Sequence, residues 1–241
     1  MCKVLHLYSD LLNLYGEYGN AAILKNRLES AGLKKVEIIK HKFGEKIDLK
    51  GIDFIYCGSG TEKKLLKAAK DLLTYRDDFI EYNKNGGIAL FTGNASELLG
   101  KSIKDFDGKT TECLTVFDYE TEFVANTRFT GDVICECSLI PHSIIGFINK
   151  SSNTTASNTP FLSVKNQFCN FYIPETDGSV NNNFFGTHLI GPILIKNPPL
   201  LEYFVNVICE NHGITPNPSE DDEAEKAYKN SLAELLGARK F

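Results

Sequence analysis

The chain has 241 residues, a formal net charge of −5 and seven cysteines. This length can bury a substantial core in one compact domain. The acidic balance offers no basic field for a polyanion, which argues against nucleic acid as the main partner. An odd number of cysteines without framework-like spacing is typical of reduced thiols in a cytosolic protein. Cys135-Glu136-Cys137 is too short for a two-residue metal knuckle and the five His are not clustered, so we expect no metal site.

The first residues and the hydropathy pattern lead us to expect a cytoplasmic protein. After Lys3, only Val4, Leu5 and Leu7 are apolar before polar residues appear, which is too few for a signal peptide. No apolar run approaches the roughly 20 residues needed to cross a bilayer.

In chain order, the first half alternates strand and helix patterns. Short apolar runs predict strands at 3–8, 36–41, 53–56 and 88–91, and helical spacing predicts helices at 21–30 and 62–75. This alternation predicts an α/β fold with a parallel sheet covered by helices on both faces.

The glycine-rich turn Cys57-Gly58-Ser59-Gly60 has two interpretations. It can cradle a phosphate or an oxyanion with its backbone N–H groups, because it follows a predicted strand and precedes a predicted helix. It can equally be a tight turn without a ligand. Its spacing matches neither a dinucleotide fingerprint nor a P-loop, which argues against nucleotide binding.

Residues 88–100, IALFTGNASELLG, form the sharpest corner of the predicted sheet. A buried-strand run ends at Phe91, and a helix-compatible segment begins at Glu97. Between them, Gly93 and Asn94 tolerate the backbone conformations of an abrupt turn. Such a corner lifts a nucleophile over the sheet edge in many α/β hydrolytic enzymes, but it is also an ordinary β–α turn, and no Cys or Ser stands at its tip. We expect this corner and the glycine-rich turn to lie close together, beyond the carboxyl ends of the strands.

The second half has the pattern of antiparallel strands. β-branched and aromatic runs fill 118–147, and further strands are expected at 168–173 and 183–189, around an Asp-Gly turn at 177–178. The polar segment 151–159 is expected to be a loop.

Two helices are expected near the C-terminus. One spans 200–212, and the other lies in the acidic segment 219–240, with Ser219 as its N-cap, acidic residues in its first turn and basic residues at its end. The apolar stripe of the last helix packs either on its own domain or on a partner. We therefore divide the chain into a domain at 1–213 and a C-terminal acidic linker and helix at 214–241.

Six segments occur in the order and spacing of the class I glutamine amidotransferase family: LYSDLLNLYGEYGN, IYCGSGTE, TGNASELLG, TRFTGDV, GFINKSSNT and GTHLIGPILIKNPPL. The chain resembles this family over about residues 3–213. Within it, the segments are most similar to GatD, the small subunit of lipid II isoglutaminyl synthase, and more distantly to the amidotransferase domain of cobyric acid synthase. The resemblance implies a flavodoxin-like, mostly parallel sheet with flanking helices and an additional antiparallel portion.

The resemblance also implies a chemistry. In the family, a Cys at the corner attacks the side-chain amide of glutamine, a His near the end of the chain activates it, and the glycine-rich turn, here Cys57, Gly58 and Ser59, holds the oxyanion. Ammonia then passes to a MurT-like ATP-dependent ligase that amidates the D-glutamate of the lipid II stem peptide; no cofactor is implied for the amidotransferase itself. Both side chains are needed, because a thiol without a nearby base is only partly ionised at neutral pH.

Both catalytic positions are substituted in this chain. Aligned through the shared LLG, the family's CGGYQLLG corresponds to GNASELLG, so the nucleophile's position falls on Gly93, or on Asn94 if the register moves by one. Neither residue can be acylated. The family's GTYLHGPIL corresponds to GTHLIGPIL, which puts Ile190 in place of the His. The family's GFENH segment has become GFINK, without its Glu and His.

Some elements of a site remain. Arg128 lies in the segment that contacts glutamine in the family, and its guanidinium can hold a carboxylate through two hydrogen bonds, although a surface Arg on a strand is the alternative. Thr92, Ser96, Cys57 and His188 are the nearest candidates to replace the lost groups, and Cys57 is the first thiol to test.

Three functions follow as hypotheses. The favoured one is a catalytically degenerate subunit that docks to a MurT-like ligase, or a related partner, as a scaffold or ligand sensor in peptidoglycan amidation. The second is an active, ammonia-supplying amidotransferase that uses displaced residues. The third is a stand-alone binder of glutamine or a related small molecule.

Overall fold

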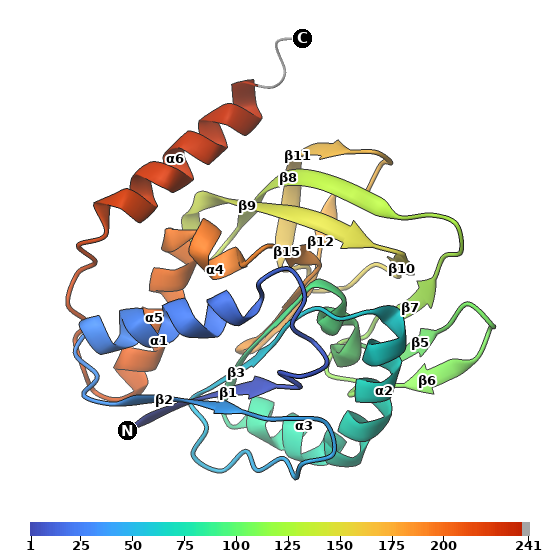
Figure 1. Ribbon diagram of the computed structural model, residues 1–241, viewed down its shortest axis with the longest axis horizontal. Coiled ribbons are helices and arrows are strands. Elements are labelled where there is room, and N and C mark those ends of the chain that lie inside the picture. Colours follow the sequence, from blue (N-terminus) through green and yellow to red (C-terminus); the bar gives the residue numbers. More distant parts are fainter. Residues whose placement is uncertain (238–241) are drawn as a thin grey trace.

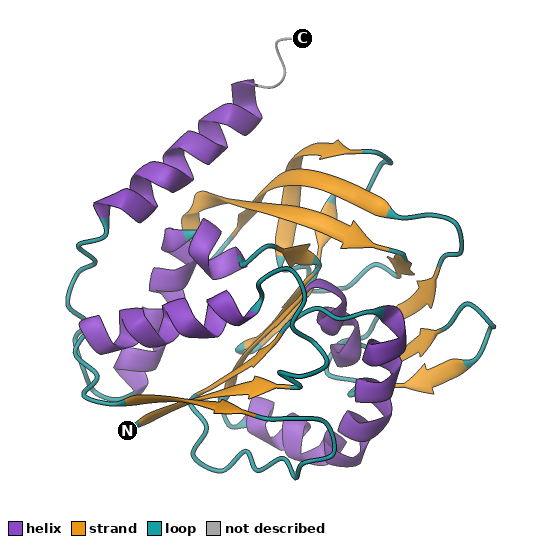
Figure 2. Cartoon of the chain, in the orientation of Figure 1, coloured by secondary structure: helices purple, strands orange, loops and turns teal. Residues whose placement is uncertain are grey.

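The central feature of the molecule is a six-stranded sheet, seen in a computed structural model that describes residues 1–237 (Figures 1 and 2). Its strands are β1 (Cys2–Leu7), β2 (Val36–Lys40), β3 (Phe54–Cys57), β4 (Ile88–Thr92), β13 (Ser179–Asn181) and β14 (Phe184–Thr187). They are arranged in the order β13-β14-β4-β3-β1-β2, and all neighbours are parallel except β13 and β14. The expected mostly parallel sheet is confirmed.

Helices cover both faces of this sheet (Figure 1). One face carries α1 (Tyr18–Ser30), α4 (Ile193–Lys196) and α5 (Pro198–Asn211), and the other carries α2 (Glu62–Leu72), the short 3-10 helix η1 (Leu73–Tyr75) and α3 (Arg76–Lys84). Thr61 caps α2 by accepting a hydrogen bond from the Lys64 N–H, as a Thr at the N-cap does. The sequence reasoning missed α3, whose polar pattern has only Phe79 as a buried apolar anchor.

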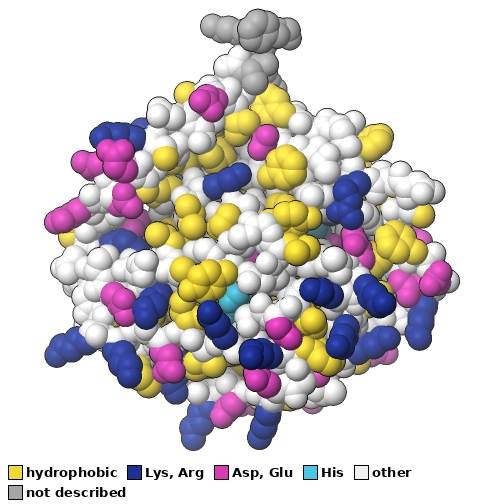
Figure 3. Space-filling model, in the orientation of Figure 1, with side chains coloured by type: hydrophobic (Ala, Val, Ile, Leu, Met, Phe, Trp, Pro, Cys, Tyr) yellow, Lys and Arg dark blue, Asp and Glu magenta, His cyan; other side chains and the backbone are white. Residues whose placement is uncertain are grey.

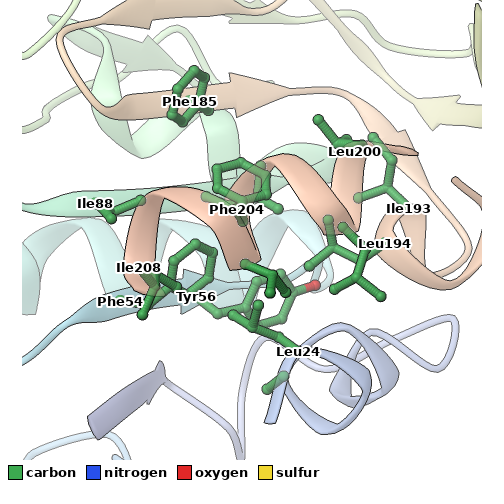
Figure 4. Packing of buried hydrophobic residues seen from close by; sticks show 14 of the residues in the cluster. Leu24, Phe54, Tyr56, Ile88, Phe185, Ile193, Leu194, Leu200, Phe204 and Ile208 are labelled. Carbon is green, nitrogen blue, oxygen red and sulfur yellow. The ribbon is translucent and has the colours of Figure 1, made fainter. Parts of the chain in front are cut away.

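Aromatic packing fixes α5 on the sheet (Figure 4). The ring of Phe204 lies 5.3 Å from those of Phe54 in β3 and Phe185 in β14, both in edge-to-face geometry. All three side chains are buried, and such pairs add about 0.5–1.5 kcal/mol each beyond their area burial. This packing holds two of the strands whose carboxyl ends reach the candidate site.

The second half forms two further sheets: the larger is the expected antiparallel portion, and the smaller is mixed, with one parallel strand pair. The larger contains β8 (Phe129–Cys137), β9 (Ile140–Lys150), β11 (Leu162–Cys169), β12 (Thr176–Asp177) and β15 (Leu189–Ile190), in the order β12-β11-β8-β9-β15. The smaller contains β5 (Ser102–Lys104), β6 (Thr110–Glu112), β7 (Glu120–Phe123) and β10 (Ser152–Thr154). Because β15 follows β14 within two residues, the chain passes directly from the parallel sheet to the larger antiparallel one, where the candidate site lies.

The corner after β4 differs from expectation. It continues only as the 3-10 helix η2 (Gly93–Leu99) and then enters β5, so the expected longer helix is absent. Gly100, in an extended conformation, ends η2. A Cβ at this position would lie 2.5 Å from the ring of Tyr119, which leaves no room for a larger residue.

The strands around 177–178 also differ from expectation. β11 ends at Cys169, and the strand predicted for 168–173 is mostly a loop. The predicted loop 151–159 contains β10. The Asp-Gly pair is not the hairpin turn; β13 and β14 are joined through Asn182, which takes the positive φ of 51° that such a turn needs.

The C-terminal helix α6 (Asp222–Gly237) packs on its own chain. Leu232 and Leu235 contact a small cluster that Tyr228 forms with Ile134 and Ile145 of the larger antiparallel sheet. The apolar stripe is therefore at least partly used within the chain.

The beginning of α6 corrects the predicted cap. Asp221, and not Ser219, accepts the hydrogen bond from the Ala224 N–H (3.0 Å), while the Ser219 hydroxyl accepts from the Asp221 N–H. Acidic residues occupy the first turn as expected. The predicted basic end, Arg239 and Lys240, lies outside the described residues.

The surface has no single dominant charge on the face shown in Figure 3, where acidic and basic side chains are interspersed. Within residues 1–237, no helix combines the length and apolarity that a membrane span requires.

Candidate functional site

The tip of β4 has the backbone of a nucleophile elbow but no nucleophile. Gly93 adopts φ +57°, the left-handed conformation that such an elbow requires. A Cβ at this position would lie 1.8 Å from the Ser59 Oγ and 2.6 Å from the Ile190 Cγ2. The positions that the resemblance assigns to the nucleophile, the oxyanion turn and the base thus lie next to one another. The side chains of Ser59 and Ile190 occupy the space that a side chain at position 93 would need.

Asn94, the alternative nucleophile position, is bound to the glycine-rich turn. Its side chain donates to the Gly60 carbonyl (2.8 Å) and accepts from the Gly60 N–H (3.0 Å). The Gly60 N–H is therefore already hydrogen-bonded to the Asn94 side chain. Of the two possible registers, the geometry favours Gly93 as the elbow position.

The predicted oxyanion turn is packed tightly against the loop that precedes α1. A Cβ at Gly58 would lie 2.7 Å from the Cβ of Glu17, and the Ser59 carbonyl accepts from the Leu14 N–H (2.9 Å). The Ser59 hydroxyl is buried and has no hydrogen-bond partner within the described residues.

Cys57 is poorly placed to replace the missing nucleophile. Its side chain is fully buried in the core on the α2 side of the sheet. Burial and the nearby Glu17 charge raise the pKa of its thiol. No hydrogen bond or ion pair joins it to an imidazole in residues 1–237, so a thiolate is strongly disfavoured at neutral pH.

A polar cavity of about 220 Å³ opens beside the elbow. Its lining includes Ser59, Asn94, Glu97, Arg128 and Lys150. The cavity lies beyond the carboxyl ends of β3 and β4, where open α/β sheets bind ligands. Its volume is below the roughly 300–1,000 Å³ of pockets for drug-sized ligands, so only a smaller ligand, of the size of an amino acid, would fit.

Arg128 stands at the rim of this cavity. Its guanidinium donates to the Glu62 carboxylate (2.7 Å) and to the Asn149 side-chain oxygen (2.8 Å). The side chains of Arg128 and Glu62 are 46% and 25% exposed, and an exposed ion pair contributes little free energy. A ligand carboxylate could therefore replace the Glu62 carboxylate as the partner of Arg128 at a small cost in free energy. The structure places Arg128 in the same cavity as the elbow, as a substrate-contacting role would require.

His188 is engaged in a buried acid–base pair that is separate from the elbow. Its Nδ1 lies 2.9 Å from the Asp177 Oδ1, and its Nε2 lies 3.8 Å from the Glu97 Oε1. Burial and the charge of Lys150 lower the pKa of His188. Although burial opposes it, the neighbouring His188 holds the pKa of Asp177 below its usual value. This pair is a neutral base oriented by an ionised acid, but no hydrogen bond connects it to residue 93.

Glu97 connects the His188 pair to the cavity. Burial raises the pKa of its carboxyl to about 7, and a hydrogen bond from Ser152 only partly opposes this shift. Its second oxygen has no partner within residues 1–237. A buried carboxyl with this pKa can donate or accept a proton near neutral pH.

Directly beneath the elbow, Glu17 forms a buried hydrogen-bond network. Its carboxylate accepts from the hydroxyls of Tyr56 and Thr92 and from the Gly191 N–H (3.2 Å). Tyr56 also accepts from Asn20 (2.7 Å). Burial raises the pKa of Glu17, while these hydrogen bonds oppose the rise.

Sequence reasoning missed most of the acidic groups. The Asp177-Gly178 pair predicts a turn, and no motif in the sequence marks Glu17 or Glu97. The available signal was position: Glu17 lies between two glycines before a helix, and Glu97 follows the elbow by four residues. The other proposed substitutes, Thr92 and Ser96, are buried and hydrogen-bonded within the chain.

This cavity contains no candidate metal-binding cluster. Within residues 1–237, the single group of three clustered His, Cys and acidic ligands is Cys2, Asp53 and His212, near the amino ends of β1 and β3 and thus at the opposite end of the sheet.

Comparison with known proteins identifies relatives along the whole chain. No family model matches the chain. It is 30% identical over 238 residues to the GatD subunit of the glutamine-hydrolyzing lipid II isoglutaminyl synthase of Staphylococcus aureus, covering 98% of this chain and 97% of that protein. It is 29% identical over 201 residues to the GatD subunit of Streptococcus pneumoniae, covering 82% and 76%.

Solved structures agree on the fold. One glutamine amidotransferase superposes with a TM-score of 0.57 at 16% identity, covering 85% of this chain and 98% of its own. A glutamine amidotransferase from Thermotoga maritima gives 0.53 at 14% identity, covering 98% and 94%. The fold is therefore that of the class I glutamine amidotransferases, and the chain belongs to the family of the GatD subunits of lipid II isoglutaminyl synthase.

Proposed function

We propose that this chain is a GatD-type subunit that no longer hydrolyses glutamine and acts through a MurT-like ligase in lipid II amidation. The observation that carries the proposal is the composition of the elbow. Gly93 provides no attacking atom, and Ile190 provides no proton acceptor. Because the Ser59 and Ile190 side chains occupy the space that a side chain at 93 would need, thiol-based amide hydrolysis is not supported there.

A partner subunit is supported by the relatives. The relative from Staphylococcus aureus is named as one subunit of a synthase, and this chain aligns with 97% of it. A chain that keeps this length while losing its nucleophile can still dock to a ligase as a scaffold.

The cavity supports an additional role as a ligand sensor. Arg128 and Asn149 lie at its rim, and Lys150 lines it with no carboxylate of residues 1–237 within ion-pair distance. These groups fit the carboxylate of glutamine or a related amino acid.

The decisive experiment measures ammonia release from glutamine by the purified chain, with and without a candidate MurT-like ligase. We expect background rates in both. A matched variant, S59G/G93C/I190H, restores a thiol and an imidazole and removes the side chain that would collide with the thiol. We expect it to exceed the wild type by at least about tenfold, since a positioned base alone contributes roughly 10²–10⁴. Enzyme-like ammonia release by the wild type would refute the proposal.

A second candidate function is glutamine hydrolysis by displaced residues, which the Asp177–His188 pair favours because it supplies an oriented base. This activity would be lost in His188→Gln, and a contribution from the buried thiol would be lost in Cys57→Ala. The third candidate, a stand-alone binder, predicts tight binding of glutamine or glutamate in calorimetry without co-purification of a ligase.

A further inference from the structure

Three metal-ligating side chains meet at the end of the sheet that faces away from the cavity. Cys2 begins β1, Asp53 immediately precedes β3, and His212 follows α5. One ligand atom from each of them, a sulfur, an oxygen and a nitrogen, lies within 4.8 Å of the other two. Residues that are far apart in the sequence thus converge, so spacing along the chain could not reveal the cluster.

We propose that Cys2, Asp53 and His212 bind one divalent cation of the zinc type, with the fourth position left to water. Thiolate, imidazole and carboxylate are the three ligand types that zinc uses in proteins, and three protein ligands with an open position form a known coordination class. The site is distant from the elbow and does not depend on the proposed function.

The geometry requires only small adjustments. The His212 Nε2 lies 2.8 Å from the Asp53 Oδ1, so the two atoms share a proton. Zinc bonds of about 2.0–2.3 Å place neighbouring ligands of a tetrahedron about 3.3–3.6 Å apart. The cation would replace the shared proton, so the His212 and Asp53 ligand atoms would separate by about 0.5–0.8 Å. The other ligand atoms, which lie no more than 4.8 Å apart, would approach by at most about 1.5 Å.

The surroundings support a bound cation. The Lys3 N–H donates to the Asp53 Oδ2 (2.7 Å), which leaves Oδ1 directed at His212, as second-sphere hydrogen bonds do in metal sites. Cys2 is fully buried, whereas the side chains of Asp53 and His212 are 24% and 23% exposed, so an ion can enter from solvent.

The protonation of the thiol gives the binding a measurable consequence. Zinc binds the thiolate and not the thiol, so the proton that a buried Cys carries without a metal must leave when the ion binds. A cation bound to the thiolate would release that proton. Binding should therefore tighten as the pH rises.

The test uses the full chain with a native N-terminus, stripped of metal and kept in a phosphine reductant. Zn²⁺ is titrated in competition with a chromophoric chelator, and Co²⁺ is added separately as a spectroscopic probe. We expect one Zn²⁺ per chain with sub-micromolar affinity, and a thiolate-to-Co²⁺ charge-transfer band in the near ultraviolet. At Zn²⁺ hundredfold above its Kd, we expect Tm to rise by about 5–10 °C.

Two variants and two matched controls locate the site. Cys2→Ser and His212→Gln should each weaken Zn²⁺ binding by at least about 100-fold, since even second-sphere changes cost about 10–100-fold. Cys137→Ser and His142→Gln, which alter a thiol and an imidazole elsewhere, should leave binding unchanged.

The proposal is overturned if Zn²⁺ binds the wild type more weakly than about 1 μM, or if either ligand variant binds as the wild type does. Should Cys2→Ser fail to fold, the Co²⁺ spectrum of the wild type decides, and absence of the thiolate band counts against the site.

Discussion

The tip of β4 and the layer directly beneath it have opposite characters. At the tip, Gly93 contributes no side chain, Ile190 is apolar, and the buried Ser59 hydroxyl has no partner within the described residues. Beneath it, the Glu17 carboxylate accepts hydrogen bonds from two hydroxyls and a backbone N–H, at the junction of α1, two central strands and the start of α4.

This difference separates the requirements of chemistry from those of folding. Gly and Ile at the positions of a nucleophile and its base add no buried polar group, so the fold tolerates them even though the nearby Ser59 hydroxyl lacks a partner within residues 1–237. The buried carboxylate cannot be lost in the same way, because its donors would then be unpaired in the core. This chain accordingly has a hydrogen-bonded polar network in the lower layer and no polar side chain at positions 93 and 190.

The largest effect is expected when the Glu17 carboxylate beneath the elbow is removed. Glu17→Ala leaves the hydroxyls of Tyr56 and Thr92 and the Gly191 N–H without their acceptor, so we expect a loss of about 3–5 kcal/mol in the free energy of unfolding. Urea unfolding measures it. Glu17→Gln keeps one acceptor oxygen and should lose less than half as much. Equal losses in the two variants would mean that the network matters less than the volume of the side chain.

The next effect is a pH dependence from Glu97. Its pKa is about 7 in the folded chain and near 4.3 when unfolded, so the folded state binds the extra proton between these values. The contribution of Glu97 to the free energy of unfolding therefore falls by about 3 kcal/mol as the pH rises from about 4 to 7, and it levels off above about pH 8.

The matched variant for this prediction is Glu97→Gln, which mimics the protonated carboxyl. Urea titration at several pH values measures the free energy of unfolding of both proteins. Between pH 4 and 7, the stability of the variant relative to the wild type should increase. A flat difference would show that Glu97 titrates normally.

A smaller effect is expected at the elbow itself. Gly93→Ala adds a Cβ that meets the Ser59 Oγ at 1.8 Å and places a side chain at positive φ, so we expect a loss of about 2 kcal/mol. Ser59→Gly removes the main collision, and the double variant should recover about half of that loss. Thermal unfolding of the four proteins in this cycle gives the coupling energy. Strict additivity would mean that the two residues are not in contact.

The smallest effect on stability is expected at the rim. Arg128→Ala removes a half-exposed ion pair with Glu62, which contributes less than about 1 kcal/mol to unfolding. If the cavity serves as a sensor, the same variant should bind glutamine or glutamate at least about tenfold more weakly in calorimetry. Unchanged affinity would place the ligand elsewhere.

The sequence determined the parallel sheet with considerable accuracy. Buried parallel strands are short apolar runs, and glycines follow two of them closely, so the predicted bounds of β1, β3 and β4 lie within one or two residues of the observed ones. The identities of the residues at two motif positions, Gly93 and Ile190, can also be read directly from the sequence; that they replace a nucleophile and its base stays a prediction.

Only the tertiary structure shows which polar side chains contact one another. Nothing local in the sequence relates Glu17 to Tyr56, Asp177 to His188, or Cys2 to His212, because each pair is joined only when separate elements pack. Burial then sets their chemistry, since the pKa of a carboxyl such as Glu97 depends on the water that packing removes. The sequence specifies the type of each residue, whereas the packing of the fold determines which groups the residue contacts and how much water reaches it.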